Sequence, residues 1–221
     1  MRAGAGRANE GPLNLVVSKP DKDAEITEQH RAVIEQLGLT PDPTVDIEMV
    51  STPAELAAAR EEIASWELRG RRPVGVFFVG HRIKQMPLDL WAHIVERIRA
   101  DHPELEPVAF HAPGDIGKAR ALAAHLTAPV RLVCRPLRQF AALVEGLEAV
   151  VSCDCGPLHL ARAKRRPLVS LFTKANWDKF APRGQRRACL FRPGGPRPEE
   201  VSNALRAVLA GEAPPFPAVK G

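Results

Sequence analysis

The stretch VVSCDCGPLHLARAKRRPLVSLF, Val150 to Phe172, decides the fold. An apolar run passes into an acid, a glycine and a proline, continues as a short helical pattern, and ends in a second apolar run opened by Pro167. Short apolar runs joined by a helix are typical of parallel strands buried on both faces. The stretch therefore predicts strand, loop, helix and strand.

The same alternation begins at Pro73 and predicts a doubly wound parallel sheet, an α/β Rossmann-like domain with helices on both faces. The expected strands are Val74–Val79, Pro107–His111, Val130–Cys134, Ala149–Ser152, Leu168–Phe172 and Ala188–Arg192. The expected helices are Leu88–Ala100, Asp115–Leu126, Leu137–Leu147, Pro157–Lys164 and Pro198–Leu209.

The region before Pro73 has a different pattern. Ala24 to Leu37 is expected to form a helix ended by Gly38, and Thr44 to Val50 a strand. Thr52 opens a capping box that predicts a helix running to about Leu68. The expected domains are a poorly ordered segment at 1–23, a linker helix and loop at 24–43, the Rossmann-like domain at 44–211 and a flexible tail at 212–221.

Composition limits the class of protein. The 221 residues are 45% hydrophobic, which suffices for a core, and carry a net charge of +5. That charge favours anionic partners, but aromatic residues are only 5% and tyrosine is absent, so a stacking surface for nucleic acid is not expected. No stretch approaches the roughly 20 apolar residues that cross a bilayer. A cytoplasmic location is expected, with peripheral contact to the inner membrane as an option.

The four cysteines, Cys134, Cys153, Cys155 and Cys189, lie in apolar runs or at their ends. They are interpreted as buried, reduced thiols. Zinc sites normally pair C-x-x-C with a second such pair or with histidines, and Cys153 and Cys155 form only C-x-C. No metal is assigned.

Two candidate site residues follow the first two strands of the sheet. Lys84 lies in a loop before a helix and could meet an anion, although a solvated loop lysine is the simpler explanation of this stretch taken alone. Asp115 opens a helix, where an N-cap is the simplest explanation and a contact with ribose hydroxyls is the alternative. In open parallel sheets, ligands bind at these strand ends.

The third candidate group is in the opening stretch. Gly156 lacks a side chain where the backbone enters a helix, so the first amides could approach a pyrophosphate. Asp154 at the strand end could accept hydrogen bonds from sugar hydroxyls, and His159 lies one turn along the same helix face. Singly, Asp154 could be a cap and His159 a packed histidine. Together they indicate a phosphate or sugar site.

These residues carry a resemblance to glycosyltransferase family 9, the bacterial heptosyltransferases. DCGPLHLARAKRRPLVSLF resembles the family signature D-S-G-P-M-H-L-A-A-A-L-G-x-P-x-V-x-L-F-G, and KQMPLDLWAHIVERI resembles its K-x-W-P-x-x-x-W segment. PLRQFAALVEGLEAVVSCD, NWDKFAPRG and EQHRAVIEQLGL also have counterparts in the family. The likeness extends from about residue 26 to 209.

The resemblance implies the second half of a two-domain (GT-B) enzyme that moves a heptose from ADP-heptose to a lipid A-linked sugar without a cofactor or metal. Lys84 would then contact the diphosphate or the sugar, and Asp154 the sugar hydroxyls. Cys155 and Gly156 would bind the diphosphate through their amides, with His159 beside them. Asp115 completes the expected donor-binding set, and no catalytic residue is assigned.

Departures from the family leave an alternative open. Met86 replaces a tryptophan, Cys155 a serine or threonine, and FTKAN stands in place of F-G-P-T. The family's first domain, with its general base, has no counterpart in residues 1–25. The alternative is a non-catalytic binding or interaction module.

An apolar stripe of Ile26, Val33, Ile34 and Leu37 predicts that residues 24–37 contact a partner domain or self-associate. A dinucleotide-dependent Rossmann enzyme is disfavoured because G-x-G-x-x-G is absent.

Overall fold

The computed structural model describes residues 3–5, 15–18, 21, 24–42, 46–212 and 217. These fall into two compact units, Met1–Asp46 with Asp178–Phe180, and Ile47–Trp177 with Ala181–Gly221. The second unit contains every candidate site residue.

The first unit contains two short parallel strands, β1 (Ala3–Ala5) and β2 (Leu15–Val17), and helix α1 (Ile26–Gln36). The sequence analysis did not predict the two strands. Most other residues of 1–23 lie outside the described residues, so the expectation of poor order there stays a prediction. No residue of α1 is buried, and Ile34 is 37% exposed. The expected role of residues 24–37 in contacting a partner is untested.

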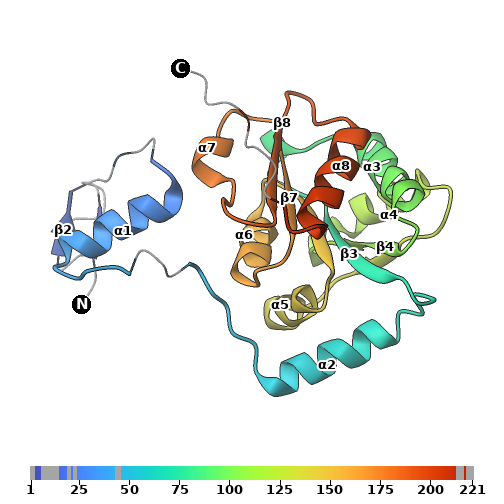
Figure 1. Ribbon diagram of the computed structural model, residues 1–221, viewed down its shortest axis with the longest axis horizontal. Helices are drawn as coiled ribbons and strands as arrows, with labels where there is room; N and C mark the ends of the chain where they lie inside the picture. Colours follow the sequence, from blue (N-terminus) through green and yellow to red (C-terminus); the bar gives the residue numbers. More distant parts are fainter. Residues whose placement is uncertain are drawn as a thin grey trace. The chain divides into compact units, whose positions relative to one another are not determined.

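The second unit is built around six parallel strands in the order β5-β4-β3-β6-β7-β8 (Figure 1). The chain starts in the middle of the sheet at β3, moves outward through β4 and β5, and returns to add β6, β7 and β8 on the other side. The strands are β3 (Arg72–Phe77), β4 (Leu105–Phe110), β5 (Arg131–Val133), β6 (Ala149–Cys153), β7 (Leu168–Phe172) and β8 (Arg187–Phe191). The strand order reverses between β3 and β6, which is where such sheets bind ligands.

Helices cover both faces of this sheet. α3 (Leu88–Asp101) packs beside α4 (Ile116–Ala124) and α8 (Pro198–Leu209) on one face. On the other face, α5 (Leu137–Glu145) lies between α2 (Pro53–Ala64) and α6 (Gly156–Ala163). Two 3-10 turns, η2 (Arg82–Lys84) and η3 (Pro113–Asp115), follow β3 and β4, and a short helix α7 (Trp177–Phe180) follows β7. The predicted doubly wound sheet is confirmed, and the elements expected after Pro73 end within two residues of those observed.

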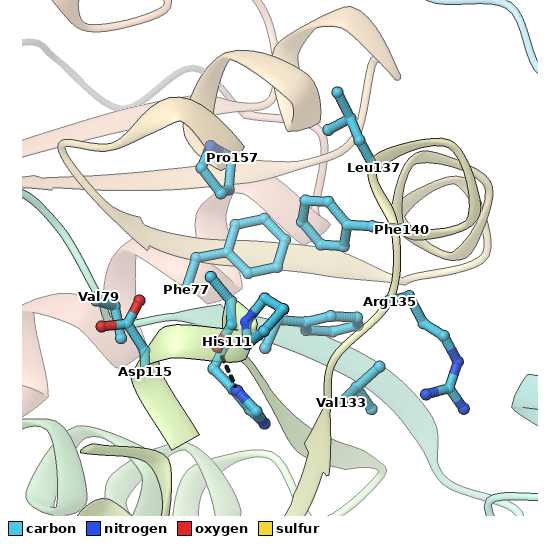
Figure 2. A pocket seen from close by; sticks show the side chains of 12 residues that line it. Phe77, Val79, His111, Asp115, Val133, Arg135, Leu137, Phe140 and Pro157 are labelled. Atoms are coloured by element: carbon cyan, nitrogen blue, oxygen red, sulfur yellow. Dashed lines mark hydrogen bonds between the residues drawn. The ribbon is translucent and has the colours of Figure 1, made fainter. Parts of the chain in front are cut away.

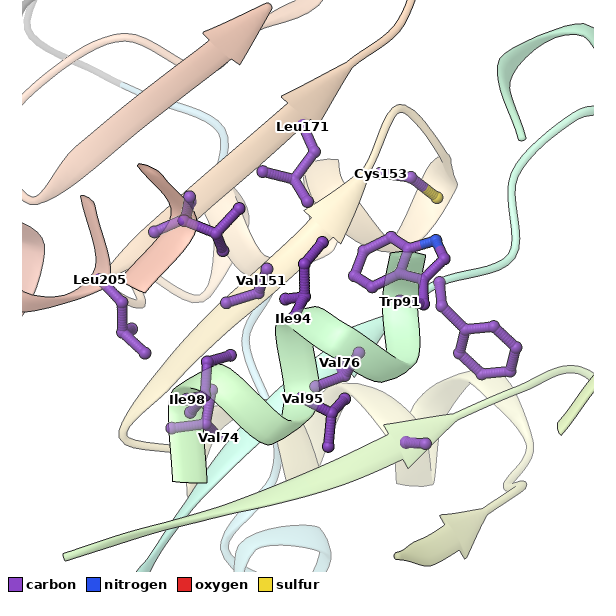
Figure 3. Close-up of a cluster of buried hydrophobic side chains, with 14 of the residues drawn as sticks. Val74, Val76, Trp91, Ile94, Val95, Ile98, Val151, Cys153, Leu171 and Leu205 are labelled. Carbon is purple, nitrogen blue, oxygen red and sulfur yellow. The ribbon is translucent and has the colours of Figure 1, made fainter. Parts of the chain in front are cut away.

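The core explains why the central strands carry apolar residues on both faces. On one face, Val74 and Val76 of β3 and Val151 of β6 pack under Trp91 and Ile98 of α3, all fully buried (Figure 3). The opposite face of β3 carries Gly75 and Phe77, against Leu147. Burial of both faces removes the alternation that a half-exposed strand would show.

Two predictions made for the region before β3 are wrong. Residues 46–50 of the predicted strand Thr44–Val50 form no strand, and residues 44 and 45 lie outside the described residues. The Met49 amide donates instead to the carbonyl of Ala163 at the end of α6 (3.4 Å), and the buried Lys164 ammonium donates to Ser51 (2.5 Å). The helix expected to reach Leu68 stops at Ala64. Glu67 and Arg69, with φ of 54° and 51°, adopt left-handed conformations that a helix cannot contain.

We expect Gly75→Ala to lower the free energy of unfolding by about 1–3 kcal/mol, because the added methyl group overpacks the core. Its Cβ would lie 2.6 Å from Leu147 Cδ1 and 3.2 Å from Phe77 Cε1. Urea denaturation measures the change. The matched control is Gly117→Ala in α4, where an added Cβ meets nothing within 4 Å and the stability should rise by up to about 1 kcal/mol. Equal stability of the two variants would contradict this description of the core.

Candidate functional site

The candidate residues gather at the carboxyl edge of the sheet. Lys84 ends η2 after β3, Asp115 ends η3 after β4, and Asp154 directly follows β6. The prediction that these three residues share one sheet edge is confirmed. β3 and β6 are adjacent, so Lys84 and Asp154 face each other across the reversal of strand order.

The centre of this edge is an ion pair between Lys84 Nζ and Asp154 Oδ2, 2.7 Å apart. Asp154 is 6% exposed, and a carboxylate so deeply buried is stable only with charged or hydrogen-bonding partners. Asn176 supplies a second one, because its Nδ2 donates to the same Oδ2 at 2.9 Å. Sequence reasoning named Lys84 and Asp154 without their pairing and missed Asn176. The sequence feature that could have indicated Asn176 was a polar side chain in the FTKAN loop that follows β7.

A close approach of two backbones makes this ion pair possible. An added Cβ at Gly80 would lie 3.2 Å from Cys153 Sγ and 3.3 Å from the Asp154 carbonyl oxygen. The loop after β3 therefore passes directly against the loop after β6. This brings η2, and with it Lys84, within reach of Asp154.

Helix α6 begins with an accessible backbone. Its N-cap, Cys155, is extended (φ −150°, ψ 171°) and forms no side-chain capping bond. Gly156 is exposed, and a Cβ added to it would meet nothing within 4 Å. The first turn of a helix carries amides with no partner inside the helix and the positive end of its dipole. His159 lies half-buried in the same turn. The start of α6 can thus accept an anion at Gly156.

The two thiols beside Asp154 differ chemically. Cys153 is buried at the end of β6, and its hydrogen bond with Cys155, together with burial, raises its pKa. Cys155 is half-buried, and its hydrogen bond with Cys153 lowers its pKa, with further help from the Ser152 hydroxyl and the Leu158 amide. All four cysteines are free, as expected. The expectation that all are buried is wrong for Cys134 and Cys155, because their strand ends reach the surface.

A cavity of about 290 Å³ opens beside the start of α6 (Figure 2). Three phenylalanine rings form its floor, with Phe77 5.3 Å from both Phe110 and Phe140 between ring centroids. Pro157 of α6 also lines it, so the cavity borders the helix start described above. The cavity could not be predicted from the sequence, because its three rings come from β3, β4 and α5.

Asp115 lies in the wall of this cavity and occupies the N-cap position of α4, but its side chain forms no capping hydrogen bond. The expected N-cap position is therefore confirmed, whereas the capping contact is not formed. Pro113–Asp115 form a 3-10 turn that leaves Asp115 at φ −105° and ψ 11°, whereas a capping residue is normally extended. Its carboxylate instead pairs with Lys118 Nζ at 2.8 Å. Asp115 thus places a carboxylate beside an apolar cavity.

Two features are absent from the described part of the chain. Within it, no three His, Cys, Asp or Glu side chains gather where they could hold a metal ion. No helix within the described ranges combines the length and apolarity needed to cross a membrane.

Comparison with known families decides the class of this protein. The profile of glycosyltransferase family 9 (heptosyltransferase) matches residues 14–205. The chain belongs to glycosyltransferase family 9. No curated protein sequence matches it.

Solved structures of this family share the fold. A family 9 glycosyl transferase from Veillonella parvula superposes with a TM-score of 0.82 at 16% identity, covering 95% of this chain and 67% of that one. ADP-heptose LPS heptosyltransferase II of E. coli gives 0.78 at 21% identity, covering 95% and 70%. E. coli heptosyltransferase WaaC with ADP gives 0.64 at 18%, covering 89% and 60%. The family 9 chain thus spans about two thirds of these proteins, and its Rossmann-like sheet is that of a GT-B glycosyltransferase.

The difference between the two neighbouring thiols can be tested chemically. With iodoacetamide at neutral pH, we expect Cys155 of the folded chain to be alkylated well before Cys153, because the thiolate is the reactive form and Cys155 is both more acidic and more exposed. Peptide mass spectrometry over time measures both rates. Cys189 is the internal control, since burial raises its pKa to about 12. Labelling of Cys153 as fast as Cys155 would overturn the assignment.

Proposed function

We propose that residues 47–212 bind a nucleotide diphosphate sugar, with ADP-heptose as the expected donor, and so form the donor side of a glycosyl transfer reaction. The observation that carries the proposal is the continuity of three surfaces. An apolar cavity, an accessible helix start and a lysine–aspartate pair adjoin one another where the strand order reverses.

Each surface suits one part of such a donor. The cavity floored by Phe77, Phe110 and Phe140 can enclose a flat base, and aromatic rings favour stacked or edge-on contact with it. The Asp115 carboxylate in the wall can accept hydrogen bonds from ribose hydroxyls. The base and ribose would therefore lie over β3, β4 and β5.

The diphosphate and the sugar would lie over β6. The amides of Cys155 and Gly156 and the ammonium of Lys84 can meet the phosphate charge, with His159 in the same turn as a further donor. Asp154 would then bind sugar hydroxyls. The proposal includes no metal ion or cofactor, because the lysine and the helix start supply the positive charge.

The reaction itself needs more than these residues. A general base must take the proton of the acceptor hydroxyl, and donor and acceptor must be held together. We assign the base and the acceptor surface to a first domain of the kind other family members have, and expect a lipid A-linked sugar at the inner membrane surface as acceptor, in lipopolysaccharide core synthesis. We place the chain in the cytoplasm, where nucleotide sugars are made.

A non-catalytic module is the second candidate. One observation favours it: the FTKAN loop places Asn176 on Asp154, so the proposed sugar-binding carboxylate already has two partners. The discriminating test is donor-dependent transfer to a lipid A-linked acceptor, with a family first domain added in trans. Transfer that is lost in Asp154→Ala supports the enzyme, whereas donor binding without transfer supports the module.

Calorimetric titration with ADP, GDP and UDP tests the proposed site directly. We expect ADP to bind most tightly and its affinity to be unchanged by EDTA, because no metal takes part. Absence of binding by all three nucleotides would overturn the proposal.

Gly156→Val should weaken ADP binding at least tenfold. The branched side chain would cover the first amides of α6, while the open space around Gly156 leaves the fold intact. Gly117→Val, at the second residue of α4, is the matched control, since its surroundings are equally open. The proposal fails at this helix if Gly156→Val binds ADP as the unmodified chain does.

A further inference from the structure

The loop between β7 and α7 contributes one side chain to the Lys84–Asp154 pair. Asn176 Nδ2 donates to Asp154 Oδ2 at 2.9 Å, and Lys84 Nζ contacts the same oxygen at 2.7 Å. Among the described residues, no hydrogen bond is formed at the other carboxylate oxygen, Oδ1. Two donors therefore hold Oδ2, whereas Oδ1 accepts from none of the described residues.

The orientation of the Asn176 amide follows from chemistry. Only the NH₂ group can donate to a carboxylate, so the amide oxygen must point away from Asp154. That oxygen, Oδ1, is buried and has no partner among the described residues. An enclosed polar atom without a partner costs about 1–3 kcal/mol. The contact with Asp154 therefore fixes the orientation of the whole amide.

Lys84 alone would hold the carboxylate loosely. Its ammonium is a point charge on a flexible stem, and its side chain is a quarter exposed. The planar amide of Asn176 is shorter and anchored at the start of α7. It adds a second direction to the hydrogen bonding at Oδ2, which restricts rotation of the carboxylate.

We infer that Asn176 is a positioning residue, which orients Asp154 so that Oδ1 is presented to a hydroxyl group of the donor's sugar. This inference rests on the proposed function and extends it to a residue outside the signature stretch. Asn176 acts through Asp154, so it strengthens binding of the donor's sugar and does not change binding of the nucleotide. The loop after β7 therefore tunes which sugar the site accepts.

The test compares two ligands, ADP and ADP-heptose, by calorimetric titration of the 221-residue chain. Asn176→Ala should weaken ADP-heptose binding at least tenfold and leave ADP binding within twofold. Asn176→Asp keeps the shape of the side chain, but its carboxylate cannot donate a hydrogen bond to Asp154 and adds a negative charge. It should weaken ADP-heptose at least as much as Asn176→Ala does. The matched control is Asn203→Ala on the exposed face of α8, which should change neither affinity.

The outcomes separate this inference from its alternatives. A structural role for Asn176 would lower the melting temperature and weaken both ligands equally, and that result would overturn the inference. Unchanged ADP-heptose affinity in Asn176→Ala would also overturn it. If the unmodified chain bound neither ligand, the proposed function itself would fail, and the inference with it.

Discussion

The adjacency of β3 and β6 is the constraint on which the site depends. The chain leaves the middle of the sheet in one direction and returns in the other, so the loops after these two strands meet where the strand order reverses. Gly80 lets the two loops approach, and the Lys84–Asp154 pair joins them. A buried carboxylate would be costly without this partner, so the pair ties the geometry of this edge of the sheet to the stability of the fold.

From this pair the site extends in two chemically different directions. Toward β4 and β5 it becomes apolar, with three phenylalanine rings under a cavity and one carboxylate, Asp115, in its wall. Toward β7 it becomes polar, with Asn176 on Asp154. A ligand with a flat base at one end and a hydroxylated group at the other, joined by phosphates, matches that change of character.

The chain combines a family fold with a locally altered site. The superposition on two family 9 glycosyltransferases is close despite 16–21% identity, because the sheet depends on apolar burial that many sequences can supply. The site depends on particular groups, and several differ here. Cys155 introduces an acidic thiol beside Asp154, and the loop after β7 introduces Asn176.

The sequence by itself determined the parallel sheet, its helices and the strand ends where the site lies. Runs such as Val150–Val151 and Leu168–Phe172 are buried on both faces, and such burial can be recognised from a few consecutive residues. It also indicated Lys84, Asp154 and Gly156 individually. Only the tertiary structure decided their partners. Lys84 and Asp154 are 70 positions apart in the sequence. Asn176 belongs to the loop after β7, and the three phenylalanine rings of the cavity come from β3, β4 and α5. The missing strand at 46–50 has the same cause. Contacts with Ala163 and Lys164 replaced the local preference, and no local pattern encodes such distant partners.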